Sequence, residues 1–172
     1  MAERGGLCYS SRMNAAHLHV TLVHIPVVVV PLGAAILAVG LARRNSAVSS
    51  TALSILLLAA IIAVPAFLLG EGAEEIVEHL PGVSEDLIEE HEEAADIALW
   101  LTVASGLLSL SSLVACKLML SWSKRAMIAT LPISIAAASL LSYAAFQGGK
   151  IRHPEAYESA RGSAEPAELH DH

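Results

Sequence analysis

Four long apolar segments separated by short polar stretches dominate the pattern of this chain. They comprise residues 18–42, 47–70, 97–116 and 126–149, and none of them contains Asp, Glu, Lys or Arg. An α-helix needs about 20 consecutive apolar residues to cross the hydrocarbon core of a bilayer, whereas runs of about 10–14 are more typical of buried helices in soluble proteins. The pattern therefore predicts an all-α integral membrane protein, a four-helix up-and-down bundle.

The polar loop between the second and third segments, residues 71–96, has structure of its own. Ala73–Leu80 is predicted to be a short acidic helix, which Pro81-Gly82 interrupts. Ser84 is a suitable N-cap for a helix that starts near Glu85 and continues without a break into the third span.

The remaining chain divides simply. We expect an N-terminal tail over residues 1–16, a transmembrane domain over 17–153 and a polar tail over 154–172. Pro26, Pro31 and Pro65 should kink the helices that contain them, because each removes a backbone donor and crowds the preceding turn.

Charge is unevenly divided between the two sides of this predicted bundle. Four crossings place both tails and the 71–96 loop on one side, here called side A, with all 17 acidic residues and all eight histidines on that side or at its membrane edge. The opposite side, side B, has no acidic residue and five cations in two short loops: Arg43, Arg44, Lys117, Lys124 and Arg125. Lys and Arg in short loops favour the cytoplasm, so both termini are predicted to lie outside.

Composition narrows the function classes. The chain is 55% hydrophobic over 172 residues with a mean hydropathy of +0.59, which leaves no room for a second folded domain. Its net charge of −7 argues against a nucleic-acid partner. Cys8 and Cys116 should lie on opposite sides of the bilayer and cannot pair, and no C-x-x-C-H motif for covalent haem attachment is present.

Histidines near the side-A ends of the spans are the candidate site residues. His24 lies within the first apolar segment, where ionisable residues usually face a bundle interior or a wet cavity. His17 is seven residues earlier and should share its helical face, whereas His19 is five residues earlier and should not. His91 lies on the apolar stripe of the third long helix and is predicted to point inward.

Further candidates lie in the polar segments. Glu75 and His79 are four residues apart, so that they share one face of the short helix, and His153 follows the Gly-Gly pair after the fourth span. The alternative interpretation for all of these residues is structural: hydrogen-bonded imidazoles and an acidic, solvated helix face.

The stretch His19-Val-Thr-Leu-Val-His24-Ile-Pro26 resembles the opening motif of the DUF2231 family of small bacterial membrane proteins. The segments GEGAEEIVEHLPGVSEDLIEEHEEAAD and GGKIRHPE also resemble its four-helix members, so the resemblance covers most of residues 17–155. Ile25 stands where an aromatic residue is commoner, and Val20 where a proline is often found. The resemblance implies a fold, the bacterial inner membrane and the pair His19 and His24, but no activity.

Three functions remain open. The first is a haem b protein for electron transfer, in which His24 and His91 clamp the iron, with His79 or His153 as a substitute ligand. Either His17 or His19 would accompany His24 at the cofactor. The acidic side A would then attract a basic redox protein. The second is a non-haem zinc, iron or copper site for binding, sensing or transport, with ligands from His24, His91, His79, Glu75 and His153.

The third function is a non-catalytic subunit or assembly factor, part of a homo-oligomer or a larger membrane complex. No catalytic residues are predicted in any of the three, so at most the chain is an electron-transfer subunit. The Glu-x-x-His repeat of di-iron bundles is missing, because Glu75 and His79 are four residues apart.

Overall fold

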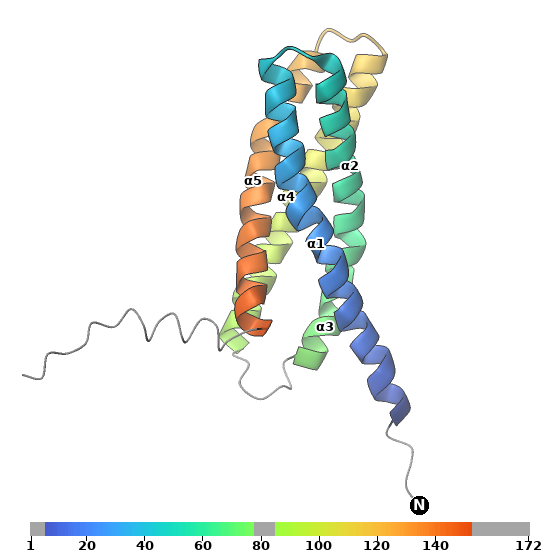
Figure 1. The fold of residues 1–172 in the computed structure, drawn as a ribbon, viewed down its shortest axis with the longest axis vertical. Helices are drawn as coiled ribbons and strands as arrows, with labels where there is room; N and C mark the ends of the chain where they lie inside the picture. The colour runs from blue at the N-terminus through green and yellow to red at the C-terminus, as the bar shows by residue number, and fades with distance from the viewer. Residues whose placement is uncertain (1–5, 78–84, 153–172) are drawn as a thin grey trace, which may run out of the picture.

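The computed structural model describes residues 6–77 and 85–152, which form five helices (Figure 1). They are α1 (Gly6–Ala42), α2 (Ser46–Leu68), α3 (Gly70–Val77), α4 (Glu85–Lys117) and α5 (Ser123–Arg152). The four long helices run alternately up and down, and α3 lies at the end of the bundle where α1 begins and α5 ends (Figure 1). The predicted four-helix bundle with a short acidic helix is confirmed.

Four helices are long and apolar enough to cross a membrane, over Ala16–Ala42, Ser46–Glu75, Glu85–Lys117 and Ser123–Ile151. Large apolar side chains such as Leu58, Ile61 and Leu107 are about 60% exposed on the outside of the bundle, whereas its interior consists mainly of Ala, Ser, Thr and Gly. Small residues inside and large ones outside are what helices packed in lipid require. The chain is thus a multi-pass membrane protein whose outer surface contacts the bilayer.

Helix boundaries differ in detail from the prediction. α1 begins at Gly6, so most of the stretch expected to be a tail is helical. α3 begins at Gly70 rather than at residue 73. The predicted start of α4 at Glu85 and its continuity into the membrane span are confirmed. The prolines are accommodated within the helices, and α5 contains one more, Pro132.

Both long hairpins turn in the same way at side B. Arg44 and Met119 have φ angles of 52° and 55°, the left-handed conformation that ends many helices. In each turn the next N–H bonds back across the last helical turn, from Asn45 to Gly40 and from Leu120 to Ala115, both at 2.9 Å. Backbone carbonyls at the two helix ends are therefore satisfied by the same motif.

The burial pattern also repeats between the two hairpins. Six buried positions of α1 recur as buried positions of α4, each 72 residues later: Pro26, Val30, Gly33, Ala34, Leu37 and Gly40, then Ala98, Thr102, Ser105, Gly106, Ser109 and Ser112. Five buried positions of α2 recur in α5, each 78 residues later: Ser49, Ala52, Leu56, Ala59 and Ala66, then Met127, Thr130, Ser134, Ala137 and Ala144. The bundle is therefore built from two helix pairs that present equivalent faces to its centre.

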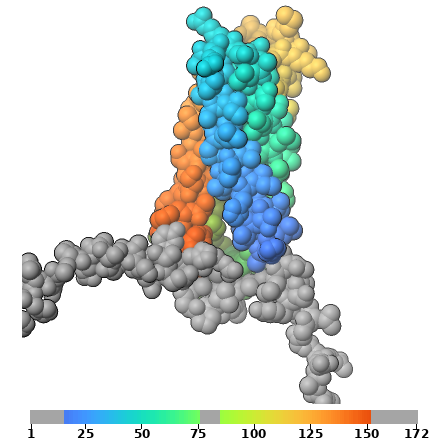
Figure 2. Space-filling model, in the orientation of Figure 1, coloured from blue at the N-terminus to red at the C-terminus, as the bar shows by residue number. Residues whose placement is uncertain are grey.

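The contacts between helices agree with this two-fold arrangement. α1 packs beside α2 and α5, and α4 packs beside α5 and α2, so that α1 and α4 lie diagonally across the bundle. In the space-filling view α1 runs along the visible face, between α5 and α2 (Figure 2). Residues that α1 and α4 direct to the centre can therefore meet there.

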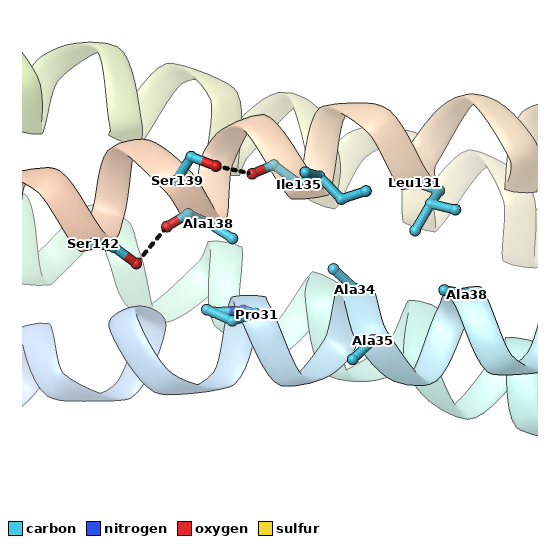
Figure 3. A pocket seen from close by; sticks show the side chains of 9 residues that line it. All are labelled: Pro31, Ala34, Ala35, Ala38, Leu131, Ile135, Ala138, Ser139 and Ser142. Atoms are coloured by element: carbon cyan, nitrogen blue, oxygen red, sulfur yellow. Dashed lines mark hydrogen bonds between the residues drawn. The ribbon is translucent and has the colours of Figure 1, made fainter.

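The two equivalent interfaces are not equally tight. Between α2 and α4, a Cβ added to Gly106 would lie 2.4 Å from Ala60 Cβ, so the backbones approach closely. Between α1 and α5 there is instead an open groove of about 360 Å³ (Figure 3). Ala34 and Ala138, which line this groove, are the counterparts of Gly106 and Ala60.

Candidate cofactor site

His19, on α1, lies half-buried at the side-A end of the bundle. Its Nδ1 is 2.8 Å from the carbonyl oxygen of Ala66 on α2. The ring also packs against Gly70, where an added Cβ would lie 3.3 Å from His19 Cε1. His19 thus joins α1 to the side-A end of α2, and a glycine leaves space for its imidazole.

His91, on α4, has the same surroundings in the second helix pair. Its half-buried ring places Nδ1 2.8 Å from the carbonyl oxygen of Ala144 on α5. An added Cβ at Gly148 would lie 3.2 Å from His91 Cε1. His91 follows His19 by 72 positions, and Ala144 and Gly148 follow Ala66 and Gly70 by 78, the same offsets that relate the buried positions. One His–carbonyl–glycine arrangement is therefore present twice.

The hydrogen bonds indicate which nitrogen of each ring carries a hydrogen. A carbonyl oxygen can only accept, so Nδ1 of each histidine must carry a hydrogen and donate it. In the neutral imidazole the other nitrogen, Nε2, then holds an available lone pair. Within the part of the chain that the structure describes, Nε2 of neither ring has a hydrogen-bond partner.

His19 and His91 lie at the same end of the bundle, on the diagonal helices α1 and α4, and each ring bonds the neighbouring helix of its own pair, α2 or α5. Histidines that ligate metals commonly donate the non-ligating ring N–H to a carbonyl or carboxylate, which fixes the tautomer and the ring orientation. His19 and His91 both have this support, from Ala66 and Ala144.

A polar cluster lies near His91, and it is present in the second helix pair only. Gln147 of α5 is 1% exposed, and its Nε2 donates to Oε2 of Glu90 and to the Tyr143 hydroxyl, the latter at 3.2 Å. Its Oε1 is buried and has no hydrogen-bond partner among residues 6–77 and 85–152. The position equivalent to Gln147 in the first helix pair is Leu69, so this cluster has no counterpart there.

Acidic side chains cover the same end of the molecule. Glu74 of α3 is partly buried there, and Glu92 of α4 is exposed. A row of further acidic residues is exposed around them: Glu71, Glu75, Glu85, Asp86, Glu89, Glu90, Glu93 and Asp96. The predicted acidic character of side A is therefore present beside the histidines.

The structure corrects the choice of histidine on α1. His24 is exposed, and its Nδ1 bonds the carbonyl oxygen of Val20 in its own helix. His17 is exposed as well. The helical-phase argument placed His17 and His24 on one face correctly but assigned that face to the interior, whereas the interior face is that of His19. The inward position predicted for His91 is confirmed.

Of the three other predicted ligands, only Glu75 lies within the described residues. Glu75 is exposed, and His79 and His153 lie outside the described residues. No group of three or more His, Cys, Asp or Glu side chains is placed to hold a metal ion in residues 6–77 and 85–152. The described site consists of two imidazoles.

Sequence reasoning missed Ala66, Gly70, Ala144, Gly148 and Gln147 as parts of the site. The first four could have been found by aligning the two halves on their histidines. Gln147 has no such signal, because its importance lies in a burial and a bonding pattern that only the folded chain reveals.

The chain matches no protein-family model, no curated protein and no solved structure.

Proposed function

We propose that the chain binds one haem b between His19 and His91 and transfers electrons at the side-A edge of the membrane. The observation that carries this proposal is the paired arrangement itself. Two imidazoles from diagonal helices, at the same end of the bundle, each donate Nδ1–H to a carbonyl of the neighbouring helix. Bis-imidazole ligation needs two opposed Nε2 lone pairs, and both rings have theirs available.

The number of ligands favours haem over a bare metal ion. A haem brings four equatorial nitrogens and needs only axial ligands from the protein, whereas a zinc site takes three or four protein ligands. The described residues supply two. Gly70 and Gly148 support the same choice, because they keep bulk away from both imidazoles. When bound, the haem would supply a one-electron redox centre.

The surroundings suggest how electrons would leave. We propose that a basic redox protein docks on the exposed carboxylates of side A, an attraction that salt would weaken. The short basic loops of side B support a cytoplasmic position for that side, with both termini outside, in the inner membrane of a bacterium. Membership of the DUF2231 family, and assembly into a homo-oligomer or a larger complex, stay predictions.

The test is haem binding by purified variants. Wild-type protein in detergent, supplied with haemin, should bind one haem per chain and give the reduced-minus-oxidised spectrum of a b-type cytochrome. His19→Ala and His91→Ala should each abolish the low-spin spectrum, because each removes an axial ligand. The matched control is His24→Ala, which removes an exposed imidazole from the same helix and should bind haem like the wild type.

Three results would contradict the proposal. Haem retained equally by wild type and by the His19→Ala, His91→Ala double variant would place it elsewhere. Absence of haem, with stoichiometric copper, zinc or iron bound through the same histidines, would favour a metal-ion site. If neither haem nor metal binds, the imidazoles are interhelical hydrogen-bond donors only.

A further inference from the structure

We infer that the α4–α5 half of the bundle carries a hydroquinone-binding site beside His91, formed by Gln147, Tyr143 and Glu90. This inference rests on the proposed haem function, for which it names the electron donor. It starts from the amide of Gln147, which is almost completely buried and has one unpartnered oxygen. A buried acceptor without a partner is unfavourable, so a ligand that supplies a donor there would be stabilised.

The orientation of this amide is fixed. Both hydrogens of Gln147 Nε2 are used, one by the Glu90 carboxylate and one by the Tyr143 hydroxyl oxygen. If the amide were turned over, Oε1 would face the Glu90 carboxylate. Two acceptors would then face each other, because an ionised carboxylate has no hydrogen to donate. The unpartnered atom is therefore an acceptor, and the group that satisfies it must be an O–H or N–H donor.

Tyr143 adds the complementary group. Its hydroxyl oxygen accepts from Gln147, which leaves its own hydrogen available for donation. A donor and an acceptor side by side suit a ligand group that alternates between C–OH and C=O. The hydroquinone hydroxyl would donate to Gln147 Oε1, and the quinone carbonyl would accept from Tyr143.

The location suits a lipid-soluble redox partner of the proposed haem. Gln147 directly precedes Gly148, which packs on the His91 ring, and Glu90 directly precedes His91. Tyr143 and Phe146, on the same stretch of α5, are about half exposed on the outer surface.

The redox step balances as follows. One hydroquinone loses two electrons and two protons to become a quinone, as both O–H bonds break. The electrons reduce ferric haem to ferrous haem one at a time, and each is passed to the acceptor protein before the next arrives. The protons leave to water at side A.

The test compares haem reduction by a short-chain benzohydroquinone with reduction by dithionite, in stopped-flow experiments on the haem-loaded protein. Gln147→Leu installs the residue found at the equivalent position 69, so the fold should tolerate it. It should slow reduction by hydroquinone about threefold to tenfold, the loss expected for one hydrogen bond, and leave reduction by dithionite unchanged. Tyr143→Phe should also slow it, whereas the control Ser139→Ala, on an exposed side chain, should not.

A second readout does not need haem. A photoreactive azidoquinone should label the α5 segment 143–147 in wild type and in the haem-free His19→Ala variant, and hydroquinone should compete with the label. Equal reduction rates in wild type and Gln147→Leu, or labelling confined to other segments, would overturn the inference. Failure to bind haem with intact labelling would overturn the haem proposal and leave the quinone site standing.

Discussion

The two halves of the bundle, α1–α2 and α4–α5, are alike where the histidines lie and unlike in their cores. His19 and His91 have equivalent carbonyl acceptors and equivalent glycine neighbours. Along the centre of the membrane, however, Val30 and Leu37 of α1 are matched by Thr102 and Ser109 of α4. The buried face of α1 is therefore apolar, whereas that of α4 is lined with hydroxyl groups.

The two halves therefore share the surroundings of the histidines but differ in the core packing that supports them. If the histidines were only part of a packing solution, we would expect them to change along with the core around them. Instead the buried face differs between α1 and α4, aliphatic in one and lined with hydroxyl groups in the other, while the His–carbonyl–glycine arrangement is the same in both halves.

The largest expected effect concerns the two interfaces between the halves, α2–α4 and α1–α5, which are packed with unequal tightness. Gly106→Leu should destabilise the bundle by about 3 kcal/mol or prevent folding, because even a Cβ at this position would overlap Ala60. Its counterpart Ala34→Leu extends into the open groove between α1 and α5 and should be neutral or stabilising by up to about 1 kcal/mol. Unfolding titrations in mixed micelles measure both, and equal destabilisation would show that the two interfaces are equally tight.

The next effect concerns the glycines beside the rings. Gly70→Val and Gly148→Val should each weaken haem binding about tenfold, because each side chain would push an imidazole from its position. Titration with haemin measures the affinity, with Ala145→Val on the exposed face of α5 as the control. A loss in only one of the two glycine variants would contradict the equivalence of the two halves.

A smaller effect is expected from the hydroxyl pair that links α4 to α5. Ser105 and Ser134 are hydrogen-bonded through their hydroxyl oxygens at 2.8 Å inside the membrane span. A double-mutant cycle with Ser105→Ala and Ser134→Ala should give a coupling energy of about 0.6 kcal/mol, typical of such bonds between membrane helices. A coupling energy of zero would mean that this hydrogen bond adds no stability to the second half.

The smallest effect should come from making the two cores more alike. The Thr102 hydroxyl is buried without a partner, and the equivalent residue in α1 is Val30. Thr102→Val should therefore stabilise the protein slightly, by about 0.5 kcal/mol, since it removes an unsatisfied polar group at nearly constant volume. Destabilisation by more than about 1 kcal/mol would indicate that this hydroxyl has a partner, such as a buried water.

The fold followed from the sequence because span length and apolar composition determine what can cross a bilayer. Charge-free segments predicted all four long helices, and Ser84 with the acidic turn after it predicted the start of α4 at Glu85. The start of α1 at Gly6 could not be predicted, because residues 6–16 carry no apolar periodicity that marks them as helix.

Only part of the candidate site could be predicted from the sequence. His91 was identified by its apolar stripe, but the choice of His24 over His19 depended on which face of α1 points inward. Helical phase relates residues to one another and gives no absolute direction when the whole segment is apolar. Alignment of the two halves on their histidines supplies that direction, because it pairs His19, not His24, with His91.

The axial-ligand assignment can be measured directly through the midpoint potential of the haem. Methionine in place of one axial histidine raises the potential of a bis-imidazole haem. His19→Met and His91→Met should therefore each raise the midpoint potential and replace the bis-imidazole electron paramagnetic resonance signal, whereas His24→Met should change neither. A shift in His24→Met together with an unchanged His19→Met would contradict the claim that His19 and His91 hold the same iron.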